Sequence, residues 1–368
     1  MSNTFVTPTI VAREAAASLD AILVAAGLIP KGISTDIAQK VGAAVKVRVP
    51  ATFAAHDFAG AGAISIQTAT EGYVDVTVDK HYDVAFKVTS AERAMQLVDL
   101  RAQLIDPAVQ ALAEKMDADA LALTAKVAAK VGTAGTTPDA LTDFTDARKK
   151  LTDNRAPLSG RVAIWDTAAE AKFLQLDAIV GAEKSGSTAA LRDASIGRVM
   201  GFDNYVSQLV PSQALAGAGT VLIDLVAGYA VGTTAIHVDG VTTALAVDDK
   251  LTIGGNDYIV VTAGALATAD QDITISPALK TAVANDDPVT LIATHRANLA
   301  FHPNFAVMGF ASLEIPGSAR GAIASTKSGI QVRVIESFDH DSLSEVYSVD
   351  VLYGTKVVRP ELACVVLG

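Results

Sequence analysis

The sequence predicts an α+β protein in which strand-rich segments flank one long helix and a small β module interrupts the chain. Residues 45–90 alternate apolar and polar side chains, residues 104–131 follow a helical period, and residues 213–293 change to short strands between Gly, Asn and Asp turns. The chain has 368 residues, of which 50% are hydrophobic and 19% charged. That composition is typical of packed domains and excludes a largely disordered chain.

Residues 46–89 are predicted to form one extended β-ribbon loop. The apolar members of the alternating pattern include Val45, Val47, Val49, Val74, Val76, Val78, Val84, Phe86 and Val88, and a Gly/Ala-rich segment lies between them at 58–63. A two-stranded ribbon is marginal in water, and its edges invite further pairing. We therefore expect the rest of the chain or a neighbouring subunit to cover it. Residues 1–45, with short helical patches at about 9–26 and 34–41, are predicted to be an arm that packs on another part.

The strongest helical pattern covers residues 104–131. Apolar side chains recur there at steps of three and four residues. Asp106 and Pro107 form a suitable start, and Gly132 is a suitable end. A helix of this length would be about 40 Å long, which suits a structural spine. A second helix is expected after Pro138, followed by a strand at 161–165 and a helix capped by Asp166.

Residues 213–293 are predicted to be an inserted all-β module. This segment contains nine Asp, no Glu, no Arg and two Lys, so it carries −7 of the total charge of −11. The strands expected there are Ala235–Val238, Lys250–Ile253, Asp257–Val261, Asp272–Ile275 and Pro288–Leu291. The pairs Asp248-Asp249 and Asp286-Asp287 lack the ligand spacing of a calcium loop, and a solvated acidic face is the preferred interpretation.

The charge and the single cysteine exclude several other classes. With 40 acidic and 29 basic residues and no long Lys/Arg run, sequence-specific nucleic-acid binding is not expected. Cys364 has no second cysteine for a disulfide or metal motif, and its apolar surroundings at 362–367 predict a buried thiol. No apolar run approaches the roughly 18 residues of a membrane span, so a soluble protein of a reducing compartment is expected.

No catalytic motif emerges from the six histidines. HExxH, GxSxG and P-loop patterns are absent from the sequence, and the histidines are interpreted as surface or turn residues. No cofactor or metal is expected, and an enzyme is the most distant of the alternatives.

The order of elements resembles that of Hong Kong 97-type phage coat proteins, namely an arm, a ribbon, a spine helix, a mixed domain and terminal strands. Local segments are similar to the coat-protein branch of short-tailed phages that carries an inserted β domain. These segments are Ile105–Ala108, Ala111–Asp119, Gly197–Asp203, Leu299–Pro303 and Asp350–Glu361.

The resemblance implies a division of the chain into functional parts. These are an arm at 1–45, an extended loop at 46–89, a peripheral domain at 90–189 containing the spine helix, a central domain at 190–212 and 294–368, and the inserted module at 213–293. It also implies a structural major capsid protein of the virion, forming pentamers and hexamers of an icosahedral shell around double-stranded DNA. A scaffolding protein and a portal would take part in assembly in the host cytoplasm, and no membrane would be involved.

Charged residues of the ribbon are the candidates for setting register between subunits. They are Arg48, Asp75, Asp79, Lys80, Asp83 and Lys87. Some capsids of this fold join a ribbon lysine to a neighbour's asparagine, and Lys80, Lys87, Asn298 and Asn304 are present, but the inserted-domain branch argues against such a cross-link.

Two other classes stay open at this point. An encapsulin-like compartment shares the fold, although it usually lacks an inserted domain. A phage decoration protein or adhesin with β modules would not need a spine helix.

Overall fold

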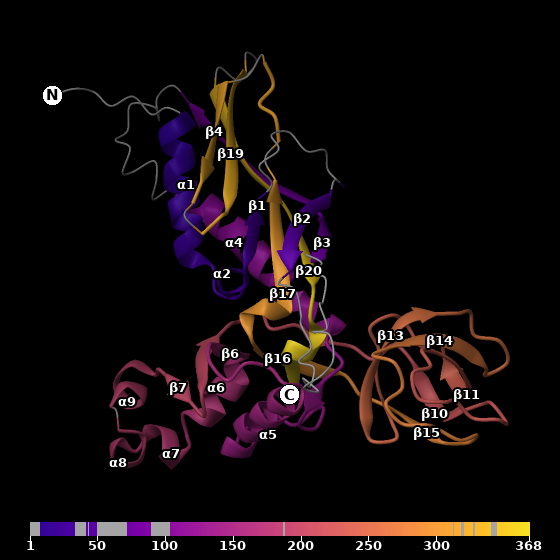
Figure 1. Ribbon diagram of the computed structural model, residues 1–368. Helices are drawn as coiled ribbons and strands as arrows, with labels where there is room; N and C mark the ends of the chain where they lie inside the picture. The colour runs from indigo at the N-terminus through magenta and orange to yellow at the C-terminus, as the bar shows by residue number, and fades with distance from the viewer. Residues whose placement is uncertain are drawn as a thin grey trace, which may run out of the picture. The chain divides into compact units, whose positions relative to one another are not determined.

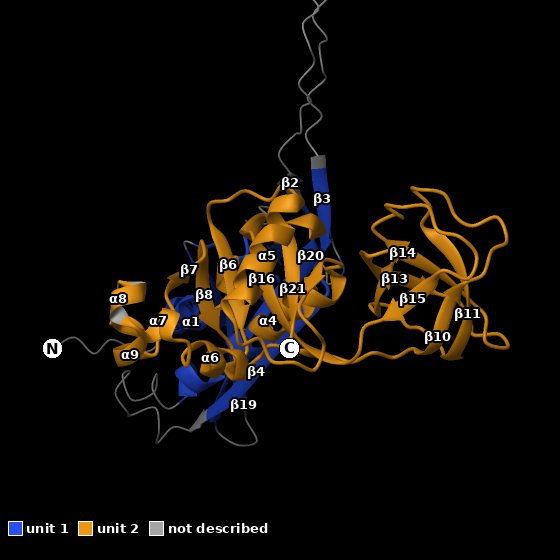
Figure 2. Ribbon diagram, turned by 90° about the horizontal axis from the view of Figure 1, so that it is seen from below, with its two compact units in different colours: residues 1–23, 29–115, 307–358 blue, residues 24–28, 116–306, 359–368 orange. Residues whose placement is uncertain are grey.

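The computed structural model describes residues 8–33, 42, 44–49, 72–89, 104–186, 188–311, 313–317, 320–326, 328–339 and 344–368. They fall into two compact units (Figure 2). Unit 1 combines 1–23, 29–115 and 307–358, and unit 2 combines 24–28, 116–306 and 359–368. The predicted helix at 34–41, the Gly/Ala-rich segment at 58–63, and His56 and His340 lie outside the described residues. The five-part division expected from the resemblance stays a prediction.

Unit 1 is built on an antiparallel-rich sheet. In its described part the strand order is β1-β17-β20-β19-β18, and β4 also pairs with β20 (Figure 1). The long strand β20 therefore organises the sheet, since it pairs with both β19 and β4. The strands are β1 (Lys31–Ile33), β4 (Lys80–Thr89), β17 (Ala306–Ala311), β18 (Arg320–Ser325), β19 (Gln331–Asp339) and β20 (Ser344–Val357).

Helix α1 (Pro8–Ile22) packs against β18 and β19 of this sheet. Its buried residues repeat at helical spacing along one face, which explains why a short N-terminal helix is stable there. They are Val11, Ala12, Ala15, Ala16 and Leu19. The small alanines allow the helix to approach the sheet closely.

Strands β2 (Ala44–Val49) and β3 (Gly72–Thr77) form a separate two-stranded ribbon. The ribbon was predicted to span 46–89, but β4 pairs with β20 over Lys80–Thr89. Lys46 lies opposite Asp75 in the register of β2 and β3, so opposite charges face each other across the ribbon.

Unit 2 contains a mixed sheet. Its order in the described residues is β5-β21-β16-β6-β8-β7, and β9 pairs with β16. The strands are β5 (Lys130–Val131), β6 (Arg161–Trp165), β7 (Arg198–Val199), β8 (Phe202–Val206), β9 (Ser212–Gln213), β16 (His295–Phe301) and β21 (Ala363–Leu367). The helical elements are α2 (Ala25–Leu28), α5 (Leu141–Asp153), α6 (Thr167–Phe173), α7 (Asp177–Val180), α8 (Ala182–Ser185), α9 (Ala189–Asp193) and the short 3₁₀ turns η4 (Pro303–Phe305) and η5 (Pro360–Leu362).

An aromatic cluster fixes α5 and α6 on this sheet. The rings of Phe144, Trp165 and Phe173 lie with centroids 4.6–4.9 Å apart, and all three side chains are buried. Asp166 caps α6 as predicted, because its carboxylate accepts the Ala169 N–H at 3.0 Å. Cys364 is buried in β21, which confirms the expectation of a structural thiol.

The spine helix is shorter than its sequence pattern. Helix α4 runs from Asp106, the predicted start, to Leu121, and a 3₁₀ turn, η3 (Ala122–Lys126), continues it to an extended Val127. The Thr124 hydroxyl donates to Leu121 O at 2.8 Å, which diverts a carbonyl from the helical ladder. The helix therefore ends well before Gly132.

Residues 218–291 form a closed antiparallel barrel of six strands, a stretch described without gaps. Its order is β10-β11-β14-β13-β12-β15 (Figure 1). The strands are β10 (Ala218–Ile223), β11 (Ala235–Thr243), β12 (Lys250–Ile253), β13 (Asn256–Ala263), β14 (Gln271–Ser276) and β15 (Pro288–Leu291). The five predicted strands are present, whereas β10 was not predicted. The barrel has a hydrophobic core of its own, including Ile253, Tyr258 and Val260.

Candidate assembly surfaces

The six predicted contact residues divide between two structural settings. Arg48 and Asp75 lie in the β2–β3 ribbon, with Arg48 opposite Tyr73 in the register. Asp79 lies between β3 and β4 and is exposed. Lys80, Asp83 and Lys87 lie on β4. The structure therefore does not gather all six on one ribbon.

On β4, Asp83 lies opposite Asp350 of β20. Two like charges in register are unfavourable unless cations compensate. Asp350 is 4% exposed and is bound by Arg333, whose Nε lies 2.9 Å from Oδ1, and by His81, whose Nε2 lies 2.9 Å from Oδ2. Asp350 is therefore a structural anion that joins β4, β20 and β19.

The base of the ribbon is held against β20 within unit 1. Lys356 Nζ donates to the Asp75 carbonyl oxygen at 2.9 Å. A Cβ at Gly354 would lie 1.8 Å from Thr77 O, so only glycine allows β20 and β3 to approach this closely. Tyr73, further along β3, is 50% exposed. The ribbon thus has a fixed base and an exposed outer part.

A buried lysine joins the barrel to the rest of unit 2. On β12, Leu251 and Ile253 face the barrel core, and Lys250 faces the opposite way. Lys250 is 2% exposed, and its Nζ donates to Thr124 O at 3.1 Å and to Val127 O. Burial lowers its pKa to about 7. The barrel lysine therefore supplies donors to carbonyl groups at the end of η3.

Asp257 of β13 is the second anchor of the barrel. Its carboxylate lies 2.8 Å from Lys130 Nζ and 2.6 Å from Lys150 Nζ. Burial alone would raise the pKa of Asp257, but the two lysines outweigh burial and hold that pKa below its usual value. Lys130 also donates to Thr252 Oγ1 at 2.7 Å. We call the contacts of Lys250 and Asp257 the barrel joint.

The predicted solvated acidic face at Asp248-Asp249 is wrong for Asp249, which is buried. It is 3% exposed, and its carboxylate accepts the backbone N–H groups of Ala216, Gly217 and Ala246 at 2.9–3.1 Å. This carboxylate fixes the segment that enters the barrel. Its task is structural, because its oxygens are occupied by backbone donors.

The histidines were predicted to be surface or turn residues, and this prediction is wrong for His295. This residue is 4% exposed, and its Nδ1 bonds to Ala293 O at 2.8 Å. His237 lies on the barrel surface between Asp272, 2.7 Å from Nδ1, and Asp224, 3.6 Å from Nε2. The hydrogen bond to Asp272 raises the pKa of His237.

The described residues contain no group of three or more His, Cys, Asp or Glu side chains suited to hold a metal ion. Among those same residues, no helix is both long enough and apolar enough to cross a membrane.

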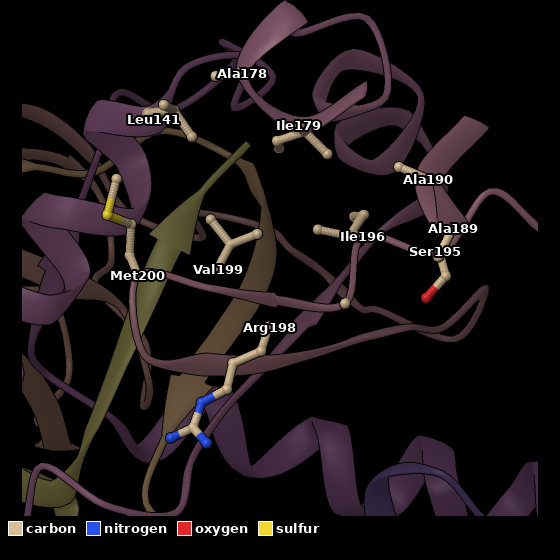
Figure 3. A pocket seen from close by; sticks show the side chains of 11 residues that line it. Leu141, Ala178, Ile179, Ala189, Ala190, Ser195, Ile196, Arg198, Val199 and Met200 are labelled. Atoms are coloured by element: carbon tan, nitrogen blue, oxygen red, sulfur yellow. The ribbon is translucent and has the colours of Figure 1, made fainter. Parts of the chain in front are cut away.

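A pocket of about 370 Å³, lined mostly by apolar side chains, lies beside β7 in unit 2. Figure 3 shows Ile179, Ile196 and Val199 converging on it, while Arg198 extends away from this apolar floor. Arg148 donates to the Met200 carbonyl oxygen at 2.5 Å and so fixes the turn after β7. No sequence motif marked this pocket, because its lining comes from α5, α7, α9 and β7.

The sequence matches no protein-family model and no curated protein. The solved structures to which the chain is similar are mostly phage capsids. The capsid of Ralstonia phage GP4 has a TM-score of 0.49 and 10% identity, with 93% of this chain and 87% of that chain covered. A structure of Mycobacterium phage Che8 has a TM-score of 0.48 and 16% identity, with coverage of 94% and 90%.

A virus-like particle from Pyrococcus furiosus is similar at a TM-score of 0.41 and 9% identity, with 96% of both chains covered.

Proposed function

We propose that this chain is a structural major capsid protein of the Hong Kong 97 type, assembling into pentamers and hexamers of an icosahedral phage head. The observation that carries the proposal is the β2–β3 ribbon. Its strands pair only with each other among the described residues, and its base is held by Lys356 and Gly354. A fixed base with an exposed two-stranded outer part suits an element that completes its contacts on a neighbouring subunit.

The order of the other elements supports the same function. The elements follow one another in the order that the sequence resemblance implies, namely the ribbon, α4, the mixed sheet, the inserted barrel and the terminal strands. The five-part division, with an arm at 1–45 and a central domain at 190–212 and 294–368, belongs to this proposal. So do the register-setting tasks of Arg48, Asp75, Asp79, Lys80, Asp83 and Lys87.

The head would enclose double-stranded DNA without sequence-specific binding, with a scaffolding protein and a portal as assembly partners. A subunit of net charge −11 disfavours strong attachment to packaged phosphates. A strongly basic inner face on the assembled shell would refute this part of the proposal.

The inserted barrel is proposed to stabilise the subunit and to control shell size. Excision of about 218–292 with a short linker would remove the joint residues Lys250 and Asp257 together. We expect the truncated chain to fold poorly or to form shells of altered size. Shells of unchanged yield and diameter would contradict this task.

Negative-stain electron microscopy of the expressed full chain tests the proposal. Closed shells or rings of five and six subunits are the expected result. A chain that stays monomeric at high concentration, with or without a co-expressed scaffold, would overturn it.

A further inference from the structure

An ordered loop of the barrel presents apolar side chains to solvent. It links β10 to β11 and comprises residues 224–234, here named the barrel loop. Val226 is 94% exposed, Val231 63% and Leu225 37%. Single exposed apolar residues are ordinary, but three within seven consecutive residues form a local apolar surface, which is typical of a contact site.

Hydrogen bonds hold the barrel loop in place. The Leu225 N–H donates to Asn285 Oδ1 at 2.9 Å, and Tyr229 and Val283 exchange two backbone hydrogen bonds of 2.9 and 3.0 Å. Gly228 has φ +64°, and a Cβ there would lie 2.3 Å from Val283 O. The loop is therefore built into one conformation, so docking it would cost little conformational entropy.

The charge of the barrel restricts what the loop can bind. Residues 213–293 carry a net −7, and of their two lysines Lys250 is buried in the joint. Asp224 is the first residue of the loop, and the Asp286 N–H donates to Ile223 O, just before it, at 2.8 Å. A second barrel or a nucleic acid would be repelled by these charges. A suitable partner surface is apolar, without excess negative charge, and has a cation within reach.

The pocket beside β7 has these properties. Most side chains that line it are apolar, and Arg198 is the only charged side chain among the described residues that line it. The Arg198 side chain is 62% exposed, and its Nε lies 3.6 Å from Asp203 Oδ1, a long ion pair that contributes little. Its guanidinium is therefore available to an incoming carboxylate.

We propose that the barrel loop of one copy docks into the pocket beside β7 of a second copy. Val226 and Leu225 would fill the apolar floor, and Asp224 would pair with Arg198 of the second copy. The two surfaces differ, so the contact is head-to-tail, and each bound copy still offers an unoccupied loop or pocket. Head-to-tail contacts close into rings when the rotation between copies closes, which links this inference to the proposed shell function on which it rests.

Disulfide trapping between two single-cysteine variants tests the contact directly. Differently tagged V226C and S195C chains are mixed, allowed to assemble and oxidised. Cys364 is buried and does not compete. Ser195 lines the pocket and Val226 is the loop tip, so docking should accelerate the V226C–S195C heterodimer about a hundredfold over random encounter. The matched control replaces V226C by V261C, which is 43% exposed on the same barrel.

The proposed contact would be overturned if the V226C–S195C heterodimer formed no faster than the V261C–S195C heterodimer. It would also be overturned if the V226C homodimer were the main product. Electron microscopy of the same samples separates this inference from the proposed function. Shells without the heterodimer would refute only the docking, whereas a monomeric chain would refute both.

A charge exchange supplies an independent measurement. R198E should weaken association, and the pair R198E and D224R, mixed as separate chains or combined in one chain, should restore it in part. Association unaffected by R198E would contradict the proposed pairing.

Discussion

The barrel and the β2–β3 ribbon are both antiparallel, yet they complete their hydrogen-bond ladders differently. In the barrel, β10 pairs with β11 and with β15, so the sheet closes on itself and surrounds its own core. In the described residues, each ribbon strand has one partner strand. Closure leaves the barrel without an open sheet edge, whereas the ribbon retains outer edges that another chain can use.

The largest loss of stability is expected from a substitution in the barrel core. Tyr258 is fully buried, and its hydroxyl accepts the Lys280 N–H at 3.0 Å. Y258A should lower the free energy of unfolding by about 3–4 kcal/mol, because it leaves a large cavity and an unpaired donor. Urea denaturation followed by circular dichroism measures this. A loss below about 1 kcal/mol would mean that the barrel core contributes little.

Disruption of the barrel joint should have the next largest effect. D257N removes the charge between Lys130 and Lys150 and leaves two cations close together in a largely buried site. We expect a loss of about 3 kcal/mol. The matched control is D153N, which removes an exposed partner of Lys149 and should leave the denaturation midpoint unchanged. Equal midpoints for the two variants would exclude an anchoring function of Asp257.

Because of Lys250, the stability of the folded chain should rise with pH above about 7. Its pKa is about 7 in the folded chain and 10.5 without burial. Between these values the unfolded chain binds more protons, so stability rises with pH by at most about 1.4 kcal/mol per unit. Below pH 7 the folded chain carries the buried charge and this gain is absent.

Other charged or titratable groups lie near Lys250, namely Asp248, Cys364, Lys130, Asp257 and His295. The measurement therefore compares the wild-type chain with K250M and with the exposed-lysine control K280M, from pH 7 to pH 9. K250M should lose the rise and K280M should keep it. The same slope in all three chains would contradict the assignment.

The smallest effect on subunit stability is expected at the ribbon. Y73A changes a side chain that is 50% exposed, so the isolated chain should lose less than about 0.5 kcal/mol. Shell yield should nevertheless fall, because the proposed function requires the ribbon to contact a neighbour. Unchanged shell yield with Y73A would argue against a neighbour at this residue.

Local sequence patterns predicted the strands of the barrel well. They did not predict features that depend on contacts between residues far apart in the sequence. Strands β11 to β15 follow apolar alternation and turn residues, which the sequence displays directly. The contact that fixes the end of η3 could not be predicted, since the donor to Thr124 O is Lys250, 126 residues away. The strands β4 and β20, which pair with each other, lie still further apart in the sequence.

The predicted contact residues show the same limitation. Alternating charges placed Asp75 and Asp83 on strands correctly. That they belong to different sheets follows from pairing, which periodicity does not encode. Lys250 was a recognisable anomaly, one of two lysines in an acidic module, but only its hydrogen bonds assign it to the barrel joint.

Amide hydrogen exchange tests most directly the claim that the barrel is self-sufficient and the ribbon needs a neighbour. The exchange of β2–β3 and of β10–β15 is compared in the dissociated chain and in assembled particles. Barrel amides should be protected in both states, and ribbon amides should gain protection only on assembly. Ribbon amides that are equally protected in the dissociated chain would contradict the account.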